Sequence, residues 1–186
     1  MSESNILALF TNQPSAFTTN ADRFKEIVEE IKKMGFNAQR MNFALAVNAP
    51  RGMCKSTWEK KVEVYKKWSL SEDQILVACG KHTRFMVALE DKIMGIMDFF
   101  VNKMGWESSI VVRRPMLVCL SLERRIIPRC LVYQILLSKG LIKKGFGLKQ
   151  LLESPESYFL NKFVEKYEEE APELLKLYQE KLNLSK

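Results

Sequence analysis

The sequence predicts an all-α protein built as an α-solenoid of about four stacked helical repeats, and three observations support this. First, only 8 glycines and 6 prolines occur in 186 residues, while 47% of the residues are apolar. This composition favours helices around a real core. Second, apolar residues recur at helical spacing in almost every segment, and strand alternation is nearly absent. Third, a similar turn returns along the chain at a nearly constant interval.

Helical spacing is clear at both ends of the chain. Apolar residues step by three and four, which places them on one face of a helix. Two such stripes are Phe24, Ile27, Ile31 and Met34, and Phe159, Phe163 and Tyr167. A helix start is also recognisable at 71–74, where the sequence SEDQ matches a capping box. Helices of roughly 8 to 15 residues are expected.

The recurring turn defines the repeat. Each turn closes an amphipathic helix that is basic at its end, and the intervals between the turns are 34, 36 and 35 residues. The turns lie near Gly35, Ser69, Gly105 and Gly140. Because two or three short helices cannot bury their own apolar faces, the units must stack on one another. We therefore expect a single curved repeat domain over residues 1–186, without a separate second domain.

The net charge of +7 is concentrated in one central block. Residues 113–149 hold nine Lys or Arg and a single acid, Glu123. Cations on a shared surface replace the counterions of a phosphate backbone, which gives salt-dependent affinity with little sequence information. The alternative is that these are ordinary solvated side chains, with Glu123 pairing locally. The candidate nucleic-acid-binding residues are Arg113, Arg114, Arg124, Arg125, Arg129, Lys143 and Lys144.

Catalytic and metal-binding motifs are missing from the sequence. The four cysteines are far apart and His82 is the only histidine, which argues against a zinc site. There is no glycine-rich phosphate loop, no H-E-x-x-H and no G-x-S-x-G. We therefore expect no catalytic residue, no metal, no cofactor and no enzymatic activity. The cysteines, Trp58 and Trp106 are interpreted as core residues, and His82 as a surface or cap residue.

The sequence also bears on the compartment. Charged residues interrupt every apolar stretch before the ~20 residues needed to cross a bilayer, so no membrane segment is expected. Residues 1–20 contain no Lys or Arg, and therefore do not have the character of a transit peptide or a secretory signal. If the protein enters an organelle, its targeting peptide is not visible in this chain.

Several motifs, in order, resemble the plant branch of the mitochondrial transcription termination factors, the mTERF family. The resemblance covers nearly the whole chain and includes the C-terminal segment from Ser157 to Tyr167. Thr83 stands where the family has a proline, and plant members usually carry further repeats before this region. The chain therefore looks like the C-terminal repeats of a member, or like a truncated copy. The matching motifs are LSEDQIL (70–76), DFFVNKMGW (98–106), SLERRIIPR (121–129) and KGLI (139–142).

The resemblance implies a half-doughnut of helical repeats with a basic concave face that binds nucleic acid, usually double-stranded DNA. It implies a role in organellar transcription, transcription termination or RNA maturation, in mitochondria or alternatively in chloroplasts. The partner is thus expected to be DNA or RNA, and the protein a monomer. A helical-repeat scaffold that binds other proteins remains the alternative, and it is favoured if the basic residues lie on the convex side.

Overall fold

The computed structural model describes residues 20–33, 55–143, 145 and 147–183 and, as isolated positions, 3, 6, 7, 11, 37, 39, 43 and 47. In these residues every regular element is helical and no strand occurs, which confirms the all-α prediction. The chain divides into two compact units, Met1–Cys119 and Leu120–Lys186. The expectation of one repeat domain over residues 1–186 stays a prediction.

Unit 1 contains the helix α2 (Ala21–Lys33) and two successive helical repeats. The first repeat consists of α4 (Lys55–Lys66), α5 (Glu72–Lys81) and the 3₁₀ helix η2 (Thr83–Met86). The second follows the same order with α6 (Glu90–Asp98), which continues into the π-helical turn η3 (Phe99–Lys103), then α7 (Ile110–Arg113) and the 3₁₀ helix η4 (Pro115–Cys119). A long helix, a shorter helix and a 3₁₀ turn therefore make up each repeat.

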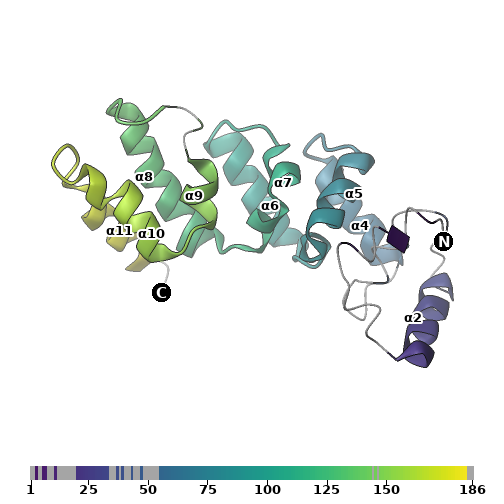
Figure 1. Ribbon diagram of the computed structural model, residues 1–186. Coiled ribbons are helices and arrows are strands. Elements are labelled where there is room, and N and C mark those ends of the chain that lie inside the picture. The colour runs from purple at the N-terminus through teal and green to yellow at the C-terminus, as the bar shows by residue number, and fades with distance from the viewer. Residues whose placement is uncertain are drawn as a thin grey trace. The chain divides into compact units, whose positions relative to one another are not determined.

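Equivalent elements of the two repeats pack against each other. α4 contacts α6, α5 contacts α7, and η2 contacts η4, while α4 also lies beside α5 within its repeat (Figure 1). Their apolar faces form a continuous core in which Tyr65 of α4 stacks on Phe85 of η2, with ring centroids 4.2 Å apart. Trp58 is buried, and Trp106 stacks on Phe100 at 5.4 Å. The interpretation of these tryptophans as packing residues is confirmed.

Unit 2 begins with a π-helical turn, η5 (Leu122–Ile126), that runs directly into α8 (Ile127–Ser138). It continues with α9 (Leu148–Glu153), α10 (Glu156–Phe163), the 3₁₀ turn η6 (Glu165–Tyr167) and α11 (Leu174–Asn183). α8 packs against both α9 and α11, and α9 packs against α10 (Figure 1). The predicted C-terminal stripe contributes to this core, since Phe159 and Phe163 are both buried.

The repeat turns share one backbone conformation. Ser69, Gly105 and Gly140 have φ values of 60°, 64° and 70°, which lie in the left-handed region. This conformation ends a helix by letting the chain fold back onto the last carbonyl groups. After α8, for example, Leu141 N–H donates to the carbonyl of Leu136 at 2.9 Å. The backbone therefore turns in the same way at three of the four predicted positions, while Gly35 lies outside the described residues.

Helix starts follow local chemistry as well. At α5 the predicted capping box is present, because Gln74 N–H donates to Ser71 Oγ at 3.2 Å and Ser71 N–H donates to Gln74 Oε1 at 2.9 Å. At η5 the Ser121 Oγ accepts the N–H of Arg124 at 3.1 Å. The wider π-helical turn also accommodates Pro128, whose ring would otherwise clash with the carbonyl four residues earlier.

Ser69 and Gly140 provide a matched test of the repeat turn. Replacing Ser69 with glycine relieves the strain of a left-handed residue that has a Cβ, whereas Gly140→Ser introduces the same strain. We expect Ser69→Gly to raise the free energy of unfolding and Gly140→Ser to lower it, each by about 1 kcal/mol. Urea denaturation followed by circular dichroism measures both, and a change of the same sign in both variants would contradict the turn assignment.

Candidate nucleic-acid interface

Three cations on successive long helical segments bind backbone carbonyl groups. Lys61 Nζ donates to the carbonyl of Ala88, Lys92 Nζ to that of Cys119 at 3.1 Å, and Arg125 Nε to that of Leu152 at 3.1 Å. In each case donor and acceptor are 27 residues apart. The acceptors lie at the end of a repeat, where short helices leave carbonyl groups without helical partners. In unit 1, Lys61 and Lys92 therefore each tie the first helix of a repeat to the end of the same repeat.

A second pair of bonds spans 31 residues. Lys81 Nζ donates to the carbonyl of Val112 at 3.2 Å in unit 1, and Lys139 Nζ donates to that of Glu170 at 3.0 Å in unit 2. Lys139 also forms an ion pair with Glu173 at 2.8 Å, and this contact lowers the pKa of the Glu173 carboxyl. Lys139, one of the nine cations of the basic block, is thus engaged within its own unit.

Arg125 and Arg129 converge on the C-terminal end of α9. Arg125 donates to the carbonyl groups of Leu152, Glu153 and Ser154. Arg129 Nη1 donates to the carbonyls of Leu151 at 3.0 Å and Ser154 at 2.8 Å. A cation at the negative end of a helix satisfies its free carbonyl groups and interacts favourably with its dipole.

Arg129 is only 2% exposed, and its guanidinium lies 4.6 Å from the centroid of the Phe159 ring. Burial lowers the pKa of this guanidinium, and the nearby charge of Arg125 lowers it further. The prediction that Arg125 and Arg129 share a helix face is correct. Their assignment to a phosphate-binding surface needs correction, because this face packs against α9 and α10 and both side chains have backbone partners.

In unit 1, the predicted residues Arg113 and Arg114 lie at the end of α7. The side chain of Arg113 is 63% exposed, and its guanidinium is 3.6 Å from the carboxylate of Glu107. Such an exposed pair is weak and easily exchanged for another anion. Arg114 is partly exposed, and its backbone N–H closes the helix on the carbonyl of Ile110 at 2.9 Å. Both residues belong to a surface where an anion can approach.

In unit 2, Arg124 and Lys143 are exposed. Arg124 lies in η5, one residue before Arg125, and Lys143 follows the Gly140 turn between α8 and α9. Lys144 lies outside the described residues. The structure thus leaves Arg113, Arg114, Arg124 and Lys143 as described candidates, two in each unit.

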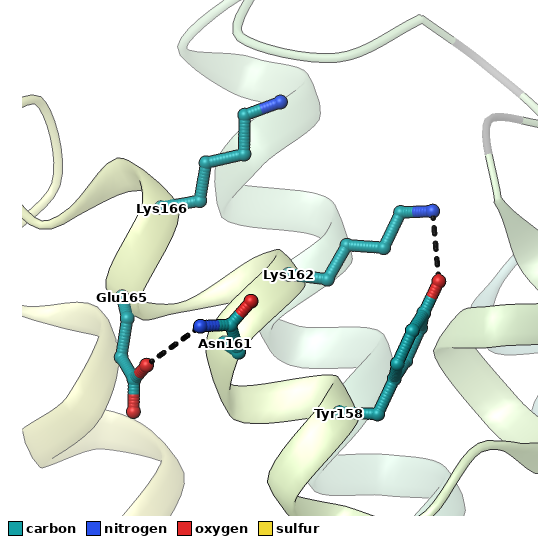
Figure 2. A pocket seen from close by; sticks show the side chains of 5 residues that line it. All are labelled: Tyr158, Asn161, Lys162, Glu165 and Lys166. Carbon is teal, nitrogen blue, oxygen red and sulfur yellow. Dashed lines mark hydrogen bonds between the residues drawn. The ribbon is translucent and has the colours of Figure 1, made fainter.

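Two basic residues that the sequence analysis did not select, the half-buried Lys162 and the exposed Lys166, lie on α10 and η6. Lys162 and Lys166 line a shallow depression together with Tyr158, Asn161 and Glu165 (Figure 2). The four-residue steps between Tyr158, Lys162 and Lys166 could have indicated a shared face. The charge count did not indicate this face, because residues 150–186 hold eight acidic residues and only five Lys, which gives the segment a net negative charge.

The described cysteines lack the properties of nucleophiles. Burial raises the pKa of the Cys79 thiol to about 12 and also raises the pKa of Cys119 and Cys130. All three are free thiols, and they remain protonated at neutral pH. His82 is confirmed as a cap residue, because its backbone N–H donates to the carbonyl of Ala78 at the end of α5. Burial and the charge of Arg84 lower the pKa of its imidazole.

Among the described residues, no group of three or more His, Cys, Asp or Glu side chains is arranged to hold a metal ion. No described helix is both long enough and apolar enough to cross a bilayer.

Comparison with known proteins gives one result. A protein-family model described as mTERF matches residues 1–160. No curated protein matches the chain, and no solved structure does. The matched range includes both repeats of unit 1, the helix α8 of unit 2 and all seven predicted site residues.

Arg124 in η5 and Arg129 in the adjoining α8 allow a surface role and a structural role to be compared by mutation. Arg129→Ala leaves the carbonyls of Leu151 and Ser154 without this donor and opens a cavity, so we expect the free energy of unfolding to fall by roughly 2–4 kcal/mol. Arg124→Ala removes an exposed side chain and should change it by no more than about 0.5 kcal/mol. Urea denaturation of the two variants checks this, and equal stabilities would refute the structural assignment of Arg129.

Proposed function

Because the chain belongs to the mTERF family, we propose that it binds nucleic acid and regulates gene expression in an organelle. Family membership carries this proposal, and the positions of the basic residues support it. We propose double-stranded DNA as the ligand, with transcription, its termination or RNA maturation as the process affected. Mitochondria are the proposed compartment, with chloroplasts as the alternative.

The proposed DNA-binding residues are the predicted cations whose side chains reach the surface of their unit. Arg113, Arg124 and Lys143 are exposed, and Arg114 is partly exposed. Lys144 completes the set as a residue of the same basic block. Contacts of this type neutralise phosphates and release counterions, and they position a protein on DNA without reading its bases. The proposed surface is the basic concave face of the repeats.

A protein scaffold would use the same repeats differently. Its binding surface would be apolar or mixed, and its affinity for DNA would not depend on this set of cations. The protein is proposed to act as a monomer and without catalysis, since binding alone accounts for the function.

Charge removal tests the proposal. We compare Arg113→Gln/Arg124→Gln/Lys143→Gln with the control variant Lys33→Gln/Lys67→Gln/Lys176→Gln, which removes the same charge at exposed positions outside the block. Fluorescence anisotropy with a labelled duplex at about 50 to 200 mM salt gives the affinity and its salt dependence. The block variant should bind at least about tenfold more weakly, and the slope of log K against log salt should shrink by about 3.

The control should retain most of the affinity and of the salt dependence. Equal losses in the two triple variants would show that total charge alone attracts the DNA, which contradicts the proposed surface. Crosslinking in isolated organelles, followed by sequencing of the bound nucleic acid, then distinguishes a DNA from an RNA target.

A further inference from the structure

α10 and η6 carry a group of two tyrosines and two lysines, here called the tyrosine–lysine surface: Tyr158, Lys162, Lys166 and Tyr167. Tyr158 and Lys166 are exposed, and Lys162 and Tyr167 are half-buried. The side chain of Tyr158 is 45% exposed, although the next residue, Phe159, is completely buried. The core of unit 2 is built from Phe159 and Phe163, whose rings stack at 5.6 Å. Tyr158 is therefore an aromatic side chain that the core does not enclose.

Each lysine of this surface is paired with a tyrosine ring. Lys162 Nζ lies 5.5 Å from the centroid of the Tyr158 ring and donates to the Tyr158 hydroxyl at 3.2 Å. Lys166 Nζ lies 5.4 Å from the centroid of the Tyr167 ring. Such cation–π contacts restrict the rings and the amines relative to each other. The result is an aromatic platform with positive charge beside it.

The geometry also gives this surface a direction. Tyr158, Lys162 and Lys166 follow one another at four-residue steps, so they lie along one edge of the depression seen in Figure 2. Glu165 lies on the other edge, where its carboxylate accepts a hydrogen bond from Asn161 Nδ2 at 3.3 Å. The ring and the two amines thus form a row in which a base and the neighbouring phosphates can be bound in sequence.

We propose that the tyrosine–lysine surface binds a short single-stranded segment of nucleic acid. An unpaired base stacks on the exposed part of the Tyr158 ring, and adjoining phosphates contact Lys162 and Lys166. Aromatic rings next to cations suit single strands because every base has a face that can stack, whereas the bases of a duplex already stack on one another. The inference rests on the nucleic-acid binding proposed above and adds a second contact site with different residues.

The ring is tested with Tyr158→Ala and Tyr158→Phe. A labelled oligothymidine and a duplex of equal length are titrated with each variant, and fluorescence anisotropy is measured. Tyr158→Ala should weaken single-strand binding by about fivefold to a hundredfold, the range for one stacked base. Tyr158→Phe, which keeps the ring, should stay within about twofold of the unmodified protein. Duplex affinity should not change in either variant.

The lysines are tested with Lys162→Gln/Lys166→Gln against Lys176→Gln/Lys181→Gln, two exposed lysines of α11 in the same unit. For the first pair we expect the salt dependence of single-strand binding to decrease by about 1.4 in log–log slope. The control pair should change it much less. An equal decrease in both pairs would overturn the assignment of phosphates to Lys162 and Lys166.

The outcomes separate this inference from the proposed function. If Tyr158→Ala binds oligothymidine as tightly as the unmodified protein does, while duplex binding is intact, the single-strand site is refuted and the proposed function stands. If Tyr158→Ala weakens duplex and single-strand binding equally, the single-strand assignment is refuted. If the unmodified protein binds neither ligand, the proposed function itself fails. Photocrosslinking of a 4-thiothymidine strand should label residues 158–167, and labelling elsewhere alone would overturn the site.

Discussion

Free backbone carbonyl groups at the ends of short helices are the constraint on which this fold depends. Every helix leaves its last four carbonyls without helical partners, so a chain of many short helices has many such groups to satisfy. Lys61, Lys92 and Arg125 each reach 27 residues forward to do this. A long, flexible cation is suited to this task, because its apolar stem packs against the helices while its end donates hydrogen bonds.

This constraint changes how the basic composition is understood. In the block of residues 113–149, Arg125, Arg129 and Lys139 have carbonyl partners inside unit 2. Positive charge in a helical-repeat protein therefore has two physical origins, the satisfaction of helix ends and the attraction of anions. A count of Lys and Arg along the sequence does not separate them. Burial and hydrogen-bond partners do, and by these criteria Arg124 and Arg129 differ completely although they share one helix.

The sequence was sufficient for the repeat architecture because its signals are local. The helical spacing of Phe159 and Phe163 and the capping box at Ser71 depend on residues a few positions apart. The turn at Gly140 needs only a residue that tolerates positive φ. The role of Arg129 was not predictable in this way, since its partners at Leu151 and Ser154 are 22 and 25 residues away. Periodicity identified the face of the helix, but not whether that face meets solvent or another helix.

The two proposed contact sites differ in what they require of the nucleic acid. Exposed cations such as Arg113 and Lys143 respond to the charge density of the backbone, which is highest in a duplex and is screened by salt. The ring of Tyr158 responds to an unstacked base, which a duplex does not present and which salt affects much less. A protein with both sites would therefore keep part of its affinity where strands are opened, as they are during transcription. Exposed aromatic rings are also enriched in protein–protein interfaces, so the ring alone does not separate the two functions, whereas the salt dependence of binding does.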